Sequence, residues 1–334
     1  MLDVTIGGPQ QLEGLTLFPL LAPAGARLPY ELLVEAVAAG TLVIGEVGEG
    51  TVPTLLARNT GERDVLLLDG EQLIGSRQNR TTNRSILLAA RSTTEVPVYC
   101  MEHGRWHFES ERMAPAPQHS PAKVRRRARE VEAARARVGL ASPACLGVAQ
   151  GDVWGDVAET IAKVGGASAT GDLSGAYEAN RERLADWEKA FPQLDRQVGF
   201  LAFAGRQPLG LDLIGCYRLY ASLHQRLLRG YLMDALEHAH DLQGAGSGTG
   251  IPAKPSGAAA AAYLDAVRQA ERTAAPTAGK GRYGVLRGLV IGGELTDEDR
   301  LVHLSAFPAA RDPEPPRGGP VGEPLAPPSW RRRH

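Results

Sequence analysis

The sequence has little of what several protein classes require. Its three cysteines, Cys100, Cys145 and Cys216, form no CxxC pair, so we expect reduced thiols rather than a disulfide framework. Its longest apolar stretches, such as residues 257–264, stop well short of the roughly 18 residues that a membrane helix needs. The start shows no basic region followed by an apolar one, as a secretory signal would. We therefore expect a cytoplasmic protein.

The net charge is also close to zero, because 37 basic and 38 acidic side chains leave a formal charge of −1. A protein whose whole surface binds nucleic acid or anionic lipid carries a strong excess of Lys and Arg, so neither partner is expected. The balance hides an asymmetry, since residues 76–137 hold 13 basic and 6 acidic residues. A local site for an anion therefore remains open.

The chain of 334 residues is long enough for one large domain or two modest ones. Short apolar runs separated by turn residues fill residues 1–110, apart from a helix signal at 29–40, and they lack the helical crossovers of a parallel sheet. Residues 123–273 are expected to be mainly helical, and residues 285–307 contain two closing strands. The helices are predicted at 123–138, 150–163, 172–191, 213–240 and 261–273.

These patterns predict an α+β fold. Its antiparallel sheet, a β-sandwich or a barrel-like sheet, combines the N-terminal strands with the C-terminal hairpin, and the helical middle section packs on it. We expect residues 1–307 to form one interleaved domain. Residues 308–334 contain eight prolines and few core formers, so they are predicted to be a disordered Pro/Arg-rich tail.

Residues 76–85 contain no apolar side chain, although apolar runs flank them, and such a segment is not expected in the core. Arginine guanidinium groups fork onto phosphate or carboxylate oxygens, and amides read sugar or base edges. The alternative is a polar hairpin tip or a protected edge strand, which the sequence supports equally well. The candidate ligand-binding residues of this segment are Arg77, Gln78, Asn79, Arg80 and Asn83.

Residues 96–108 bring a thiol, a carboxylate and an imidazole close together in sequence, as Cys100, Glu102 and His103. A cysteine needs a neighbouring base or positive field to become a nucleophile. The favoured interpretation is that Cys100 is a small buried hydrophobe. With His107 the group also resembles a metal site, but a second ligand pair is missing, so no metal is predicted.

Two carboxylates, Glu71 and Glu102, follow or end predicted strands. They could share acid and base roles, or one could bind a ribose diol. Alternatively each is an ordinary ion-pair partner of Arg77, Arg80 or Arg105. The chain has no P-loop and no GxGxxG fingerprint, so a Walker or Rossmann nucleotide site is not expected.

These segments resemble a bacterial family of largely uncharacterised proteins, named for its association with ADP-ribosylglycohydrolases and with rhodanese and phosphatase superfamily proteins. The resemblance covers residues 15–307 and implies a role near NAD or ADP-ribose metabolism. It rests on residues 68–75 leading to 78–80 and Asn83, on 96–106, on 150–154, on 186–192 and 198–199, and on 302–307.

The prediction is a polar pocket for an anionic ligand derived from a nucleotide or ADP-ribose, held also by Arg105 and by stacking on Trp106. Hydrolysis of the ligand is a further hypothesis, with Glu71, Glu102 and Cys100 as candidate catalytic residues. No cofactor is identified. The alternative is a non-enzymatic interaction or scaffold protein, whose polar loop and basic helix at 123–137 contact an acidic partner. Nucleic-acid binding through that helix is disfavoured because Glu130 and Glu132 interrupt it.

Overall fold

A nine-stranded sheet joins the start of the chain to its C-terminal half. The computed structural model describes residues 3–23, 28–51, 54–102, 110–137, 146–166, 170–244 and 254–310. Eight strands lie in the order β1 (Thr5–Ile6), β3 (Leu15–Leu21), β13 (Gln197–Ala204), β14 (Gln207–Ile214), β18 (Arg300–Pro308), β17 (Val290–Asp297), β16 (Arg282–Arg287) and β15 (Glu271–Ala275). The ninth, β2 (Gln10–Leu12), pairs with β3, and all pairs in this sheet are antiparallel.

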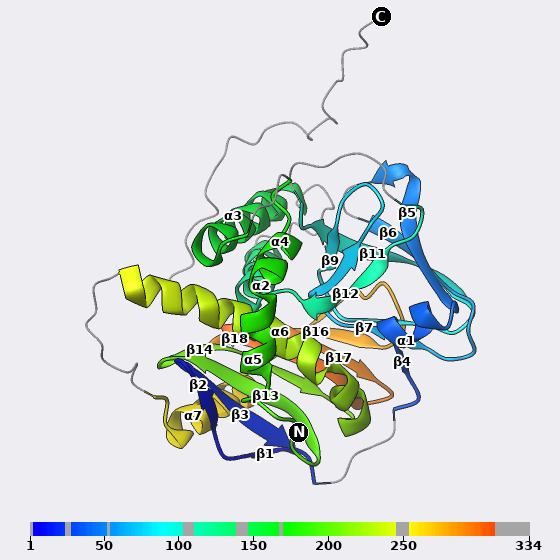
Figure 1. Cartoon of the computed structure of the whole chain (residues 1–334). Helices are drawn as coiled ribbons and strands as arrows, with labels where there is room; N and C mark the ends of the chain where they lie inside the picture. The colour runs from blue at the N-terminus through cyan, green and yellow to red at the C-terminus, as the bar shows by residue number, and fades with distance from the viewer. Residues whose placement is uncertain are drawn as a thin grey trace, which may run out of the picture.

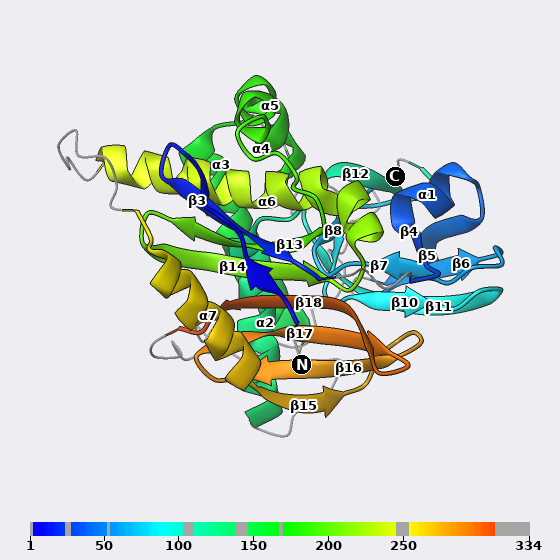
Figure 2. The same cartoon turned by 90° about the horizontal axis from the view of Figure 1, so that it is seen from below.

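Helices cover both faces of this sheet (Figure 2). The side chains of Leu201 and Phe203 pack with α7 (Gly257–Gln269) on one face. Phe200 and Ala202 pack with the long helix α6 (Tyr217–Gly244) on the other. All eight residues of β13 are buried, so this strand has the near-continuous apolar sequence of a strand covered on both sides.

Two smaller sheets form the N-terminal half (Figure 1, blue and cyan). The first has the order β12 (Ala114–His119), β8 (Glu71–Ile74), β9 (Arg80–Thr82), β11 (Ser92–Cys100), β6 (Thr54–Asn59) and β5 (Leu42–Thr51). The second has the order β10 (Ile86–Leu88), β7 (Val65–Leu67) and β4 (Glu31–Leu32), in which β4 and β7 run parallel. The short helix α1 (Leu33–Ala38) packs on these strands through Leu33 and Ala36.

The helical middle section lies against the sheets. It comprises α2 (Ala122–Arg137), α3 (Leu146–Val164), α4 (Ser174–Ala179), α5 (Arg181–Glu188) and α6. Asn180 divides the predicted helix 172–191 into α4 and α5, and the predicted helix 261–273 ends at Gln269, where β15 follows. No helix in the described part of the chain is long and apolar enough to cross a membrane.

The predicted α+β class is confirmed. The closing strand β18 pairs with β14 on one side and with β17 on the other, and β13 connects β14 to β3, so the ends of the described chain share one sheet. The sequence analysis named no strand between residues 123 and 273, and it therefore missed β13 and β14. β13 is buried along its whole length, which removes the apolar and polar alternation by which a strand is read from sequence. β14 does alternate, with Leu209, Leu211 and Leu213 at every second position, but the sequence analysis did not use this signal.

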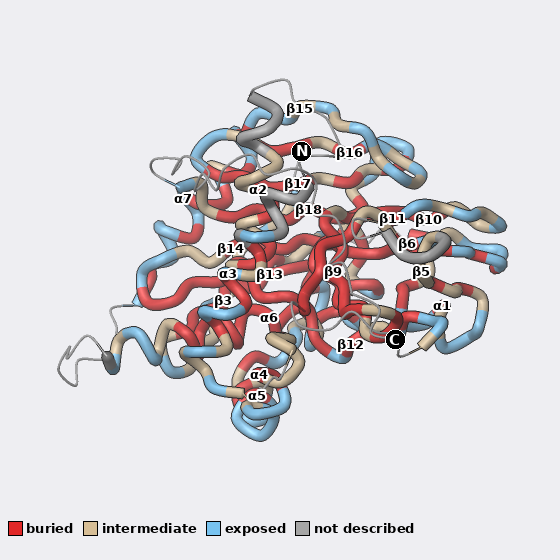
Figure 3. The backbone as a smooth tube through the Cα atoms, turned by 90° about the horizontal axis from the view of Figure 1, so that it is seen from above, coloured by how far each residue is buried: buried red, intermediate tan, exposed pale blue. Residues whose placement is uncertain are grey.

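One expectation was wrong. Residues 76–85 were not expected in the core, but all of them except Arg77 and Arg84 are buried, and β9 runs through the interior (Figure 3). The strand is tolerated there because its polar groups find partners inside the protein. The hydroxyl group of Thr82 donates a hydrogen bond to the carbonyl oxygen of Leu68. The hydroxyl groups of Thr81 and Ser120 are hydrogen-bonded to each other at 3.0 Å.

Two predictions remain untested by the fold. The assignment of residues 1–307 to one interleaved domain stays a prediction. Most of the predicted tail, residues 311–334, lies outside the described residues.

Candidate functional site

The turn that joins β8 to β9 is the centre of the predicted site. Gly75 and Ser76 both have positive φ angles, 119° and 53°, a conformation that glycine adopts at no steric cost. The backbone N–H of Gly75 donates to Oδ1 of Asn79 at 3.0 Å, and that of Ser76 donates to Oγ of Ser110 at 3.1 Å. The backbone N–H of Met101 donates to the carbonyl oxygen of Asn79 at 2.9 Å. The turn is therefore fixed against the end of β11.

The structure brings several predicted residues together at this turn. Nη1 of Arg80 donates to Oε1 of Gln78 at 2.8 Å and to Sγ of Cys100 at 2.7 Å. Nε2 of Gln78 donates to the carbonyl oxygen of Glu102 at 3.0 Å, and the backbone N–H of Asn79 donates to Oε2 of Glu102 at 3.2 Å. Five residues named from the sequence thus form one connected polar group.

A residue that the sequence analysis missed, Asp172, belongs to the same group. It lies just before α4 and accepts hydrogen bonds from the side chains of Ser174 and Asn79. Burial and the nearby charge of Glu102 raise the pKa of Asp172 above its ordinary value, against the opposing effect of these hydrogen bonds. No sequence pattern links residue 172 to residues 79 and 102, since only the fold brings them together.

The arginines of the segment differ in their surroundings. The side chain of Arg80 has no exposed surface, and its Nη2 lies 3.5 Å from Oε1 of Glu46. Arg84 is ion-paired with Glu132 and donates to the carbonyl oxygen of Pro276. Arg77 is half-buried and, within the described residues, makes no hydrogen bond or ion pair. Arg77 is thus the guanidinium best placed for an external anion.

Other predicted residues lie apart from the turn or outside the described chain. Asn83 follows β9, and its buried Oδ1 has no hydrogen-bond partner among the described residues. Arg105 and Trp106 lie outside the described residues, as do His103 and His107.

Glu71 has a partner that the sequence did not indicate. Its Oε2 lies 2.6 Å from Nη2 of Arg226 on α6, and its Oε1 lies 3.3 Å from Nη1. The same guanidinium donates to the carbonyl oxygen of Ala116 at 2.9 Å. A forked pair of this kind fixes the position of both groups. Glu71 and Glu102 therefore have separate partners in this structure.

Cys100 is completely buried, and Cys216 is also a buried free thiol. Burial raises the pKa of Cys100 to about 11, although the charge of Arg80 acts in the opposite direction. A thiol in this state is a poor nucleophile at neutral pH. Its hydrogen bond from Arg80 instead connects β9 to β11.

A buried ionic cluster lies where the large sheet meets the N-terminal strands. The guanidinium of Arg125 on α2 contacts Asp212 at 2.6 and 2.8 Å and Asp69 at 2.8 Å. His303 on β18 contacts two polar groups. Its Nε2 lies 3.0 Å from Oδ1 of Asp212, and its Nδ1 lies 2.6 Å from Oγ of Ser85. The hydroxyl of Ser85 is 97% buried, so this serine, histidine and aspartate series connects three distant segments inside the core.

The ligand atoms of Asp69, Asp212 and His303 lie within 4.8 Å of one another, as those of a metal site would. However, one nitrogen of Arg125 already binds the Oδ1 atoms of both aspartates. The guanidinium therefore supplies the positive charge, and these residues do not fit a metal ion while Arg125 is in place. Burial opposes ionisation, but the charges of Arg125 and His303 outweigh it and lower the pKa of both aspartates.

His119 lies beside this cluster and is 99% buried. Neither of its ring nitrogens has a hydrogen-bond partner among the described residues. Burial and the positive charge of Arg125 lower its pKa well below the ordinary value, so the imidazole is neutral. Its ring packs against Gly70, whose φ angle is +83° and whose position leaves no room for a Cβ atom.

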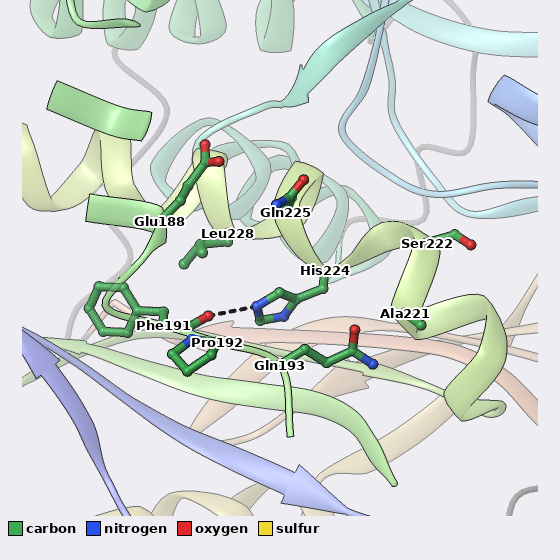
Figure 4. A pocket seen from close by; sticks show the side chains of 9 residues that line it. All are labelled: Glu188, Phe191, Pro192, Gln193, Ala221, Ser222, His224, Gln225 and Leu228. Atoms are coloured by element: carbon green, nitrogen blue, oxygen red, sulfur yellow. Dashed lines mark hydrogen bonds between the residues drawn. The ribbon is translucent and has the colours of Figure 1, made fainter. Parts of the chain in front are cut away.

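A hollow of the described surface lies elsewhere, between α5 and α6 (Figure 4). It has a volume of about 370 Å³ and is lined by Glu188, Phe191, Pro192, Gln193, Ala221, Ser222, His224, Gln225 and Leu228. Nε2 of His224 donates to the carbonyl oxygen of Phe191 at 2.9 Å, and its Nδ1 accepts from the hydroxyl of Tyr220 at 2.6 Å. Both nitrogens of this imidazole are used inside the protein.

The basic helix predicted to contact an acidic partner uses its described arginines internally. Arg125 and Arg129 are buried, and Arg129 contacts Glu132 and Tyr283 at 2.6 Å each. Arg127 is paired with Glu130 and Asp156. In the part of the helix whose side chains the structure describes, these contacts leave little free positive charge for a partner.

Comparison with known proteins identifies the family of the chain. The model of one protein family, the ARG and Rhodanese-Phosphatase-superfamily-associated Protein domain, matches residues 3–307. The chain therefore belongs to this family, as its resemblance indicated. No curated protein matches the chain, and no solved structure does.

Proposed function

We propose that the chain binds an anionic ligand derived from a nucleotide, of the ADP-ribose type, at the turn between β8 and β9. The observation that carries this proposal is the half-buried side chain of Arg77, which directly precedes Gln78 and Asn79 in the turn and has no hydrogen-bond or ion-pair partner among the described residues. A guanidinium in this position forms charge-assisted hydrogen bonds with phosphate oxygens.

The family description supports the choice of ligand, because it records an association with ARG proteins, which we take to be the ADP-ribosylglycohydrolases. Such an association would also fit a protein that binds a protein partner. That role, as a non-enzymatic interaction or scaffold protein, is the alternative to binding a small ligand. The internal pairing of the arginines of α2 disfavours that alternative for an acidic partner.

Calorimetric titration with ADP-ribose tests the proposal. We expect binding by the unchanged chain and a roughly 10- to 100-fold weaker affinity after Arg77→Ala, the loss of a charged hydrogen bond of about 1.5–3 kcal/mol. Arg181→Ala is the matched control, because Arg181 is an exposed arginine on α5 paired only with Glu178 among the described residues. Absence of binding, or equal affinities for the two variants, would contradict the proposal.

A further inference from the structure

The hollow between α5 and α6 has the size of a small-ligand site (Figure 4). Its volume of about 370 Å³ lies in the range of roughly 300–1,000 Å³ that is typical of small-molecule pockets. One wall is α6, and the other is formed by residues 188–193, at the end of α5 and just beyond it. None of the described residues that line the hollow belongs to the turn between β8 and β9. The hollow is therefore a second candidate site, which the proposed function leaves unused.

Hydrogen bonds fix the loop that forms the second wall. The carbonyl oxygen of Phe191 accepts from Nε2 of His224 at 2.9 Å, and the hydroxyl of Tyr220 holds the other nitrogen of that imidazole at 2.6 Å. The next carbonyl oxygen, that of Pro192, accepts from Nε2 of Gln10 at 2.7 Å. Because both walls are held in place before a ligand arrives, binding costs little ordering of the protein.

The hollow offers no free positive charge. None of its described lining residues is Lys or Arg. Burial lowers the pKa of His224 below its ordinary value, so the imidazole is neutral at neutral pH. The one carboxylate of the lining, that of Glu188, is paired through both oxygens with the guanidinium of Arg229. Phosphate and carboxylate groups are bound by cationic donors, so the lining suits an uncharged ligand.

Two glutamine amides provide the free hydrogen-bonding groups of the lining. Gln193 and Gln225 are exposed and make no hydrogen bond within the described residues, and in Figure 4 the imidazole of His224 lies between them. An amide presents a donor and an acceptor side by side, which is how glutamine reads a donor and acceptor pair on the edge of a nucleobase. The exposed ring of Pro192 adds an apolar surface on which a planar base can pack.

We propose that this hollow binds an uncharged nucleoside through its base, with the amides of Gln193 and Gln225 on the base edge. The site takes no phosphate. It is independent of the anion site at Arg77, and it gives the chain a second class of ligand.

Titration with adenosine, followed through the methyl resonances of the protein by NMR, tests the location of the site. We expect saturable shifts for Ala221 and Leu228, which line the hollow. Ala262, an exposed alanine on α7, should not shift. Absence of saturable shifts at Ala221 and Leu228 would overturn the proposal.

Two pairs of variants test the contacts. Ala221→Trp places a large side chain in the hollow and should abolish adenosine binding, whereas Ala262→Trp on α7 should leave the affinity unchanged. Gln225→Ala should weaken binding roughly 2- to 10-fold, the loss of one uncharged hydrogen bond. Gln269→Ala is its control, since Gln269 is an exposed glutamine at the end of α7. Equal affinities within either pair would contradict the assigned lining.

Three ligands, compared in the Arg77→Ala chain, test the ligand class. This variant removes the proposed anion site, and it should bind adenosine as tightly as the unchanged chain does. AMP should bind no more tightly than adenosine, because the lining has no cation for its phosphate, and D-ribose should not bind, because it lacks a base. Tighter binding of AMP, or equal affinity for D-ribose, would overturn the assigned class. None of these outcomes bears on binding of ADP-ribose at Arg77.

Discussion

Arg80 shows how a single polar residue is held inside this protein. Its side chain has no exposed surface, and its contacts with Gln78, Cys100 and Glu46 come from three strands or turns. A buried guanidinium left without partners would cost several kcal/mol. The polar composition of β9 is therefore compatible with burial only because the neighbouring strands provide acceptors.

The environment of Cys100 leads to a prediction about its reactivity. Burial and a pKa raised to about 11 keep the thiol neutral and covered, so we expect iodoacetamide at pH 8 to leave Cys100 unmodified in the folded protein. Peptide mapping by mass spectrometry measures the modification of each cysteine separately. Rapid labelling of Cys100 without denaturant would contradict the prediction, and labelling in guanidinium chloride is the positive control.

At the scale of single elements, the start of α2 depends on α6. The carboxylate of Asp234 on α6 accepts the backbone N–H groups of Ala122 and Lys123 at 2.6 and 3.1 Å. It thereby satisfies two of the four donors that a helix start leaves unpaired. α2 in turn carries Arg125 into the ionic cluster, so this contact supports the centre of the molecule.

Asp234 predicts a measurable pH dependence. Burial raises its pKa to about 7, although the two backbone hydrogen bonds oppose the shift, whereas an unfolded chain has a value near 3.9. Between these values the folded chain binds the extra proton, so the contribution of Asp234 to the free energy of unfolding decreases as the pH rises from about 4 to 7. Urea unfolding at several pH values checks this.

In Asp234→Asn this contribution should disappear, so the difference in unfolding free energy between the two proteins should vary over that pH range. A constant difference would contradict the pKa assigned to Asp234. The variant also loses one acceptor at the start of α2, and we expect it to be less stable by about 1 kcal/mol near pH 4, where Asp234 is protonated in the folded chain. This loss should shrink as the pH rises toward 7, because the stabilising contribution of Asp234 decreases over that range.

The elements also show what the sequence can and cannot predict. Capping residues and apolar periodicity place the helices, because these signals are local. β13 lacks alternation and β9 lacks apolar residues, so neither strand is predicted from local pattern, whereas the alternating leucines of β14 are a local signal. In the candidate site, the closeness of Gln78, Asn79 and Glu102 follows from neighbouring strands. The contribution of Asp172 and the partner of Glu71, Arg226, depend on long-range packing.

For the whole molecule, the cluster of Arg125, Asp69, Asp212 and His303 joins the large sheet to the N-terminal strands. Removal of one partner from a buried ion pair is strongly destabilising, because the other charge remains unpaired. We expect Arg125→Met to lower the free energy of unfolding by about 3–5 kcal/mol at pH 7. Arg126→Met is the control, since Arg126 lies on the same helix but is 39% exposed.

The effect of Arg125→Met should also depend on pH. In the unchanged chain the pKa of both aspartates is lowered, so their contribution to stability is present above about pH 4 and is lost as the pH falls further. In the variant the two carboxylates are buried without a cation, and protonation favours the fold. The two proteins should therefore become more similar in stability as the pH falls from 7 toward 4, and a difference that grows would contradict this account.

The strand order of the large sheet has a consequence for synthesis on the ribosome. β3, at residues 15–21, finds its central partner only in β13 at residues 197–204, and β18, the last strand of the described chain, lies in the interior of the sheet between β14 and β17. The nascent chain must therefore keep apolar strand edges uncovered until about residue 308 has left the exit tunnel. Pairing of this long range folds slowly, and exposed edges invite aggregation. Newly made chains of this protein should thus depend on chaperones until β18 has emerged and can pair with β14 and β17.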